Sequence, residues 1–231
     1  MIKLITIDLD NTLWDSEPVI RKAEHTLAGW LGARLPAVLQ RLRSENIPAL
    51  RSELIEAEPH LRYRVSALRI RLLQRLMQMT GLDERNATRH AEAAFEVFLH
   101  ARQQVVLYEQ TLPLLQKLSH RYALISITNG NADLKTIGLH HYFTHRVSAD
   151  ELGVGKPEPD IFLHALGLGD AQPFEAVHIG DHLGDDIGGA QSVGMHTIWF
   201  NPGAQASEGK TERQVRSLEE IPALIASLDK G

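Results

Sequence analysis

The stretch IKLITIDLDNT, residues 2–12, joins a short apolar run to two closely spaced carboxylates. Residues 2–8 are rich in Ile and Leu and indicate a buried strand. Asp8 and Asp10 lie at its carboxyl end, where each would cost several kcal/mol if it were buried without a partner. Ligands of open α/β sheets bind at the carboxyl ends of the strands. The pair therefore indicates either a metal and phosphate site or an ordinary turn, in which Asp and Asn are common.

Short apolar runs recur along the rest of the chain. They lie at residues 122–127, 144–148, 177–179 and 197–200. Helical patterns separate or follow them, at residues 111–120, 132–137, 159–166, 186–193 and 217–228. Strands that alternate with helices are typical of a parallel sheet covered on both faces. The sequence therefore predicts an α/β fold with five main strands, and a loop in the Gly-, Ala- and Ser-containing residues 202–209.

Residues 16–102 differ from the rest, because they contain no convincing strand. One amphipathic helix is predicted by apolar residues three and four apart: Leu61, Val65, Leu68, Leu72, Leu76 and Met79. A second is predicted by Ala87, Ala91, Ala94, Phe98 and Arg102. Helix starts or breaks are indicated by Pro36, Pro48 and Pro59. We expect an insertion of four or five helices rather than a separate helical-bundle domain with an unrelated function, because the strands of the sheet resume only after residue 102.

Composition limits the partners of the protein. The 231 residues include 24 basic and 29 acidic side chains, for a net charge of −5, and no cysteine. Proteins that hold nucleic acid are usually basic, so no nucleic-acid partner is expected. No apolar run reaches the roughly 18 residues that span a bilayer, and the acidic Asp8 comes too early for a signal peptide. The lack of cysteine excludes disulfides and thiolate metal sites and fits a reducing cytoplasm, whereas the sequence makes no prediction of oligomeric state.

The charge is unevenly divided. Residues 16–102 carry a net charge of +4, and the remainder carries −9. A basic insertion would attract a small anion, although arginines on helices also serve only to keep them soluble.

Two further segments place polar groups behind predicted strands. Thr128, Asn129 and Gly130 follow the run 122–127. A small hydroxyl and Asn-Gly allow backbone amides to approach an anion closely, but an ordinary turn with Asn131 as helix N-cap fits as well. Lys156 lies between Gly155 and Pro157, so it is either a point charge for phosphate on a stiff loop or a solvated lysine.

A third segment follows the run 177–179. Asp181 lies at the strand end, and Asp185 and Asp186 open a predicted helix, where the dipole favours acids. The helix dipole explains why an acidic residue such as Asp185 would occur at this position, but it does not explain Asp181. Because carboxyl ends of parallel strands share one edge, we expect all four segments to converge there.

Together these segments resemble the four motifs of the haloacid dehalogenase superfamily of phosphatases. The matching runs are DLDNT at 8–12, TNG at 128–130, GKPEPDIF at 155–162 and GDHLGDD at 180–186. The resemblance covers the whole chain. It implies a Rossmann-like core of residues 1–15 and 103–231 and a helical cap domain of residues 16–102, with hinges near residues 15 and 103. It also implies Mg²⁺-dependent hydrolysis of a small-molecule phosphate monoester.

The resemblance assigns roles residue by residue. Asp8 would be the nucleophile that forms an aspartyl-phosphate, and Asp10 the general acid and then base. Thr128 and the backbone amides around Asn129 and Gly130 would bind the phosphoryl oxygens, and Lys156 would stabilise their charge. Mg²⁺ would be held by the Asp8 carboxylate, the Asp10 carbonyl and Asp181. Asp186 would orient a metal-bound water or Lys156 from outside the ligand set.

Other activities on this fold stay open. A dehalogenase expels halide, which needs no proton, so the presence of Asp10 favours phosphate esters; phosphomutases keep both carboxylates. A non-catalytic phosphate-binding regulatory module would usually lose Asp8 or Asp10. His182 stands where many relatives have Ser or Asp, and we expect it to be satisfied or exposed rather than a ligand.

The insertion also suggests a substrate. Residues 56–65 with Arg69, together with ITNGNA at 127–132 and DIGGA at 186–190, resemble bacterial phosphatases of riboflavin metabolism. Those enzymes act on flavin mononucleotide or the ribitylaminopyrimidine phosphate. Arg and Tyr in this run would stack on a ring or hold a polyol, or the arginines are simply the solvated face of a helix.

Overall fold

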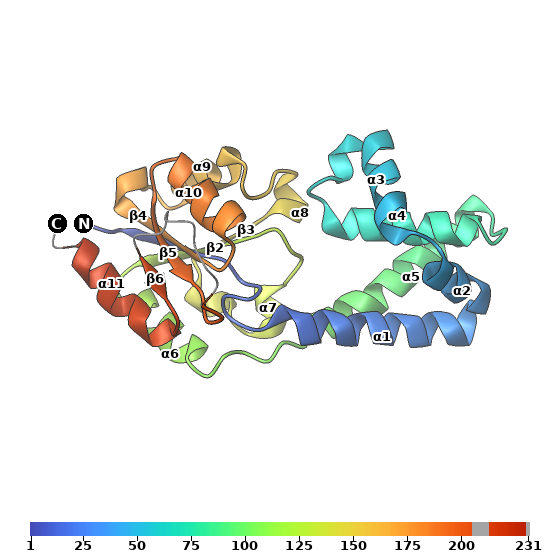
Figure 1. Ribbon diagram of the computed structural model, residues 1–231, viewed down its shortest axis with the longest axis horizontal. Helices are drawn as coiled ribbons and strands as arrows, with labels where there is room; N and C mark the ends of the chain where they lie inside the picture. Colours follow the sequence, from blue (N-terminus) through green and yellow to red (C-terminus); the bar gives the residue numbers. More distant parts are fainter. Residues whose placement is uncertain (205–212, 230–231) are drawn as a thin grey trace. The chain divides into compact units, whose positions relative to one another are not determined.

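The computed structural model describes residues 1–204 and 213–229. The chain forms two compact units (Figure 1). The core unit comprises Met1–Asp15 and Val106–Gly231, and the helical unit comprises Ser16–Val105. No helix in the described part of the chain has the length and apolarity needed to cross a membrane.

The core unit is built on one parallel sheet. In the described residues its strand order is β3-β2-β1-β4-β5-β6. The strands are β1 (Leu4–Ile7), β2 (Ala123–Thr128), β3 (His145–Ser148), β4 (Ala176–Gly180), β5 (His196–Phe200) and β6 (Gln214–Val215). The predicted parallel α/β fold is confirmed. The sixth strand was missed because two residues, paired beside Trp199 and Phe200, are too few to show a periodicity.

The central strand brings the predicted site together. All four residues of β1 are buried, and Ile7 pairs with Ser126 of β2 and Ile179 of β4. The three strands therefore end at nearly the same level. Residues that follow Ile7 and Ile179 meet at this carboxyl edge, as the sequence predicted for parallel strands.

Helices cover both faces of the sheet. In Figure 1, α9 (Pro159–Leu168) and α10 (Gly189–Ser192) lie on one face, and α6 (Thr111–Ser119) and α11 (Ile221–Leu228) lie on the other. Two short helices, α7 (Leu134–Ile137) and α8 (Ala149–Leu152), follow β2 and β3.

Local details differ from the sequence predictions. The N-cap of α7 is Asp133, whose side chain accepts hydrogen bonds from the backbone amides two and three residues later, so Asn131 is not the cap. The helix predicted at 186–193 is a π-helical turn, Leu183–Gly188, followed by α10. Of the predicted loop 202–209, residues 205–209 lie outside the described residues.

The helical unit contains α1 (Ser16–Arg34), α2 (Pro36–Ser44), α3 (Ile47–Ala57), α4 (Val65–Gln78) and α5 (Glu84–Arg102). Five helices agree with the predicted four or five in the described residues. Helix α5 packs against α1 and α4. Their shared core includes Leu27, Leu31, Leu68, Leu72, Leu76, Ala91, Ala94, Phe95 and Phe98.

The prolines begin helices, as predicted, but one helix is shorter than its apolar pattern. Pro36 and Pro59 are the first residues of α2 and of a 3₁₀ turn, and Pro48 is the second residue of α3. Leu61 belongs to that 3₁₀ turn, because the backbone leaves the helical region at Arg64 before α4 begins. Leu61 is nevertheless buried, so the apolar spacing continues across the break.

Candidate active site

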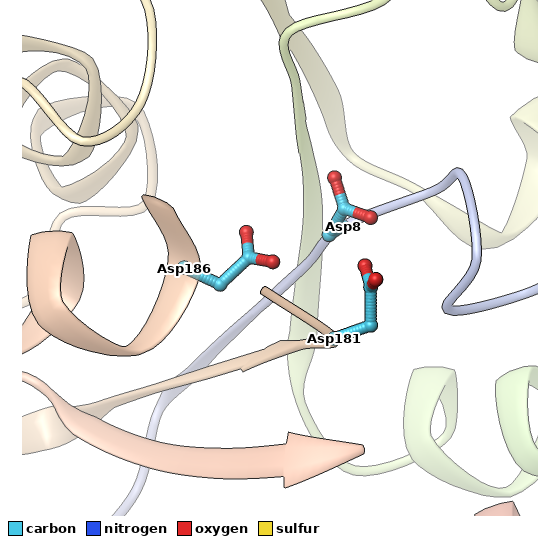
Figure 2. A group of neighbouring side chains, drawn as sticks. All are labelled: Asp8, Asp181 and Asp186. Atoms are coloured by element: carbon cyan, nitrogen blue, oxygen red, sulfur yellow. The ribbon is translucent and has the colours of Figure 1, made fainter. Parts of the chain in front are cut away.

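Three carboxylates converge at the carboxyl edge of the sheet. Asp8 follows β1, Asp181 follows β4, and Asp186 lies in the π-helical turn. Figure 2 shows their side chains pointing toward one another, and one ligand oxygen from each lies within 4.8 Å of the others. Asp8 and Asp186 are buried and Asp181 is partly buried. Among the described residues, these three carboxylates have ligand oxygens close enough to one another to hold a metal ion.

Lys156 lies between two of these carboxylates. Its Nζ is 2.5 Å from Oδ1 of Asp8 and 2.5 Å from Oδ1 of Asp186. Burial opposes the charge of Lys156, but the two carboxylates outweigh it and raise its pKa, so the ammonium stays charged. Burial also opposes the charge of Asp186, but Lys156 and the hydrogen bond with His178 hold its pKa below the usual range.

The cost of burying a negative charge is not fully compensated for the other two carboxylates, Asp8 and Asp181. Burial raises the pKa of Asp8 well above its usual range, because Lys156 only partly offsets burial and Asp186 adds repulsion. Burial raises the pKa of Asp181 to about 6, again with repulsion from Asp186. Lys156 brings one positive charge to three carboxylates, so a divalent cation with oxygen ligands would relieve the remaining negative charge. The donor set therefore fits a hard metal ion.

Asn129 holds the lysine loop in place. Its Oδ1 accepts a hydrogen bond from the backbone N–H of Lys156 at 2.8 Å, and its Nδ2 donates to the carbonyl of Lys156 at 2.9 Å. The family resemblance implied a role only for the backbone amides around Asn129. The side chain instead clamps a residue 27 positions later, which no local pattern could reveal.

Two threonines lie at the same edge. Thr128 is the last residue of β2, is buried, and its Oγ1 accepts a hydrogen bond from the backbone N–H of Gly130 at 2.9 Å. Thr12, the last residue of the DLDNT motif, had no predicted role. Its Oγ1 lies 3.2 Å from Oδ2 of Asp8 and 3.4 Å from Oδ1 of Asp181, so it links these two carboxylates.

Asp10 does not belong to the group of three carboxylates. Its Oδ1 accepts a hydrogen bond of 2.9 Å from the indole Nε1 of Trp14. Trp199 is also buried and makes a similar hydrogen bond after β4. Its Nε1 donates to the backbone carbonyl of Asp181 at 2.7 Å. The resemblance predicted Asp10 as a metal ligand through its backbone carbonyl, which stays a prediction.

A buried histidine, absent from the sequence predictions, supports Asp186. Nε2 of His178 lies 3.1 Å from Oδ1 of Asp186, and its Nδ1 lies 2.8 Å from Oγ1 of Thr6. Burial lowers the pKa of His178, so the ring is neutral. A neutral ring satisfies both contacts if Nε2–H donates to Asp186 and Nδ1 accepts from Thr6. A lone histidine inside an apolar strand was the available signal.

Gly180 makes room for Asp186. A Cβ at position 180 would lie 2.3 Å from Cγ of Asp186, a distance that side-chain atoms do not adopt. Glycine at position 180 thus has a physical reason in this chain: the side chain of Asp186 packs directly on it.

His182 caps the turn that carries Asp186. Its Nδ1 accepts a hydrogen bond from the backbone N–H of Asp185 at 2.9 Å, and its own backbone N–H donates to Oδ2 of Asp186 at 2.9 Å. The side chain of His182 is 65% exposed. The helical turn therefore begins with a histidine cap rather than with the two acids.

Arg69 of the helical unit is engaged within that unit. Its guanidinium lies 3.7 Å from the centre of the Phe98 ring and 2.7 Å from Oε1 of Glu24. Arg69 is thus neither a simply solvated side chain nor placed by these contacts to hold a substrate.

Comparison with known families matches residues 2–194 to the haloacid dehalogenase-like hydrolases. The chain belongs to this family. The predicted family and its class of enzyme, a hydrolase, are therefore confirmed. Among curated proteins, the chain is 34% identical to the 5-amino-6-(5-phospho-D-ribitylamino)uracil phosphatase of Escherichia coli (strain K12) over 201 residues, or 87% of this chain and 84% of that relative.

Solved structures give two further comparisons for this hydrolase. It resembles a 2-haloacid dehalogenase from Pseudomonas syringae pv. Tomato DC3000 with 39% identity and a TM-score of 0.93, over 98% of this chain and 99% of that one. It resembles a HAD phosphatase from Thermococcus onnurineus with 26% identity and a TM-score of 0.69, over 97% and 98%. Phosphatase and dehalogenase names both occur, so the residues of the site have to distinguish the two reactions.

Proposed function

We propose that this hydrolase is a Mg²⁺-dependent phosphatase that cleaves a small-molecule phosphate monoester through a phosphorylated Asp8. The observation that carries the proposal is the buried group of Asp8, Lys156, Asp181 and Asp186. It combines a carboxylate nucleophile, a fixed positive charge and a set of hard oxygen ligands at one sheet edge. Asp10 lies two residues beyond the nucleophile, as a separate carboxyl group.

The proposed reaction has two displacements. In the first, an oxygen of Asp8 forms a bond to phosphorus, and the bond from phosphorus to the ester oxygen breaks. The leaving oxygen keeps the electron pair and takes a proton from Asp10, which releases the alcohol. In the second, Asp10 removes a proton from water, whose oxygen forms a bond to phosphorus. The bond between Asp8 and phosphorus then breaks, which restores the carboxylate and releases inorganic phosphate.

Lys156 and the end of β2 hold the phosphoryl group in this scheme. The ammonium of Lys156, fixed by Asp186 and by the Asn129 clamp, stabilises charge on Asp8 and on the phosphoryl oxygens. Thr128 and the backbone amides of Asn129 and Gly130 bind the remaining oxygens. These are the roles that the resemblance assigned, with the side chain of Asn129 added as a positioning group.

Mg²⁺ would be held by Asp8 and Asp181, with the carbonyl of Asp10 as a further ligand. When bound, the ion neutralises charge between the nucleophile and the anionic substrate. The carboxylate of Asp186 is near enough to belong to the same acidic group. Its short contact with Lys156 supports a role in holding the lysine rather than in direct ligation.

For the substrate, we propose flavin mononucleotide or 5-amino-6-(5-phospho-D-ribitylamino)uracil. The Escherichia coli relative is a phosphatase for the second compound. The net charge of +4 on residues 16–102 also suits an anionic ester.

Dehalogenation is the second candidate, because the Pseudomonas syringae structure is described as a 2-haloacid dehalogenase. Halide leaves without a proton, so a dehalogenase does not need Asp10 as a general acid.

A phosphomutase or a non-catalytic phosphate-binding module would also fit parts of the site. An intact Asp8 disfavours the module, and release of free phosphate would distinguish hydrolysis from a mutase.

The deciding experiment compares phosphate and halide release. Purified protein with Mg²⁺ is incubated with 4-nitrophenyl phosphate, with the two proposed substrates, and with 2-chloropropionate. We expect free phosphate from the esters, no chloride from the haloacid, and loss of activity with EDTA or Asp8→Asn. The control Asp185→Asn changes a partly exposed carboxylate of the same turn and should keep phosphate release. Chloride release without phosphate release would refute the proposal, and poor turnover of both proposed substrates would refute the substrate class alone.

A further inference from the structure

We infer that Trp14 is a positioning residue for Asp10: its indole N–H selects which carboxyl oxygen of Asp10 carries the proton that is given to the leaving group. The inference rests on the proposed function, in which Asp10 is the general acid. The observation behind it is the 2.9 Å hydrogen bond from Nε1 of Trp14 to Oδ1 of Asp10. Trp14 is fully buried and Asp10 is partly buried, so this bond is partly shielded from competition with water.

The chemistry of the indole gives the bond its direction. The Nε1–H of tryptophan donates and cannot accept. It therefore favours Oδ1 of Asp10 as an accepting oxygen, which is the carbonyl oxygen when the acid is protonated. The proton of Asp10 is then on Oδ2. A hydroxyl or amide partner, which both donates and accepts, would not make this distinction.

The backbone brings the indole to the acid. Asn11 has a φ of 61°, a left-handed conformation that Asn tolerates better than most residues. The resulting turn lets the N–H of Asn11 donate to the carbonyl of Trp14 at 2.8 Å, and the N–H of Leu13 donates to the carbonyl of Leu9 at 2.9 Å. Asp10 and Trp14 thus face each other across a closed turn with hydrogen bonds at both side chain and backbone.

The backbone of Leu13 and Trp14 is fixed by the segment that returns to the core unit. Trp14 forms a β-bridge with Leu107. Its neighbour Leu13 accepts hydrogen bonds from the N–H of Tyr108 at 3.1 Å and from Oγ1 of Thr111 at 2.7 Å. The backbone that carries the indole is therefore held in place by a segment almost 100 residues later in the chain, as a positioning group for Asp10 requires.

The test uses the acidity of the leaving group. Kinetics are measured on 2,4-dinitrophenyl, 4-nitrophenyl and phenyl phosphate, which have similar shapes but leave with decreasing ease. Dinitrophenolate leaves without a proton, whereas phenolate benefits from one, so a general acid matters most for phenyl phosphate. In Trp14→Phe we expect kcat/KM for phenyl phosphate to fall about tenfold, a part of what general acid catalysis contributes. Activity on the dinitrophenyl ester should change little.

Two control variants and a second variant at position 14 show whether the loss in Trp14→Phe comes from general acid catalysis. Asp10→Asn should show the same dependence on leaving group, but more steeply. Trp199→Phe removes the matched indole bond, which serves Asp181 rather than Asp10, and should lower activity on all three esters by one common factor. Because Trp14→Phe also changes packing, a second variant carries 3-(benzothienyl)alanine at position 14, which replaces the N–H by sulfur with nearly the same volume.

The outcomes separate the inference from the proposed function. An equal loss on all three esters, or no loss, in both position-14 variants would overturn the role of Trp14 if Asp10→Asn still shows the leaving-group dependence. Full activity of Asp8→Asn, or no hydrolysis of any ester by the unaltered protein, would instead refute the phosphatase mechanism, and the inference with it.

Discussion

Asp181→Asn is expected to stabilise the metal-free protein, although it removes a proposed metal ligand. The reason is burial, which together with repulsion from Asp186 raises the pKa of Asp181 to about 6. Asparagine has nearly the same shape and keeps an oxygen for the contact with Thr12. The substitution removes a negative charge that lowers the stability of the folded state.

The magnitude follows from the shift. A change from 3.8 to about 6 corresponds to about 3 kcal/mol for a group fully shielded from water. Asp181 is only partly buried, so solvent screening reduces this to about 1 kcal/mol. A gain of about 1 kcal/mol raises the unfolding midpoint by about 3 °C in a domain of this size.

The sign also predicts the pH dependence. Below a pH of about 4, the carboxyl of Asp181 is protonated in both the folded and the unfolded chain, and its charge costs nothing. Above about pH 6 it is ionised in both, and the folded state bears the full cost. The stabilising effect of Asp181→Asn should therefore be largest at pH 7.5 and disappear as the pH is lowered toward 4.

The assay is thermal unfolding in EDTA at several pH values, followed by the same measurement in Mg²⁺. We expect Mg²⁺ to raise the midpoint of the unaltered protein more than that of Asp181→Asn, because binding to the folded state alone stabilises it. Asp185→Asn removes an equal charge from a partly exposed position and should change the midpoint little. A lower midpoint for Asp181→Asn in EDTA at pH 7.5, or an equal gain in the Asp185 control, would refute the reasoning.

Substitutions at three further positions test the supporting contacts. Gly180→Ala should remove most activity, since its Cβ would displace the side chain of Asp186; kcat of the folded variant measures this. His178→Phe should lower the free energy of unfolding by about 1–3 kcal/mol, since Asp186 loses a buried hydrogen bond. His178→Gln should recover part of that loss in urea unfolding. Arg69→Ala should destabilise the helical unit by about 1–2 kcal/mol through the lost contact with Phe98. Calorimetry measures this, and unchanged stability with a higher KM would place Arg69 at the substrate instead.

Much of the fold could be predicted because the relevant signals are local. The apolar runs at residues 2–8 and 122–127 show strands without any knowledge of their neighbours. In a parallel sheet, strand ends share one edge, so Asp8, Thr128 and Asp181 could be placed together before their distances were known. The boundary errors also have local causes. The break at Arg64 interrupts α4 without interrupting its apolar spacing, and β6 is too short to have a period.

The contacts that hold the site could not be predicted in this way. Asn129 binds the backbone of Lys156, and His178 supports Asp186 from within a strand. Trp14 is close to Asp10 in sequence, but the direction of its indole depends on the turn at Asn11 and on a bridge to Leu107.

By itself, then, the sequence determined the chemical groups and the sheet edge where they gather, because apolar runs and the polar residues that follow them are encoded over a few residues. Only the tertiary structure decided which carboxylates share the lysine, which ones bear an uncompensated cost of burial, and which is held by an indole. Those outcomes depend on distances of a few ångströms between segments far apart in the chain. Charge, burial and hydrogen bonding all change over such distances, and no spacing in the sequence records them.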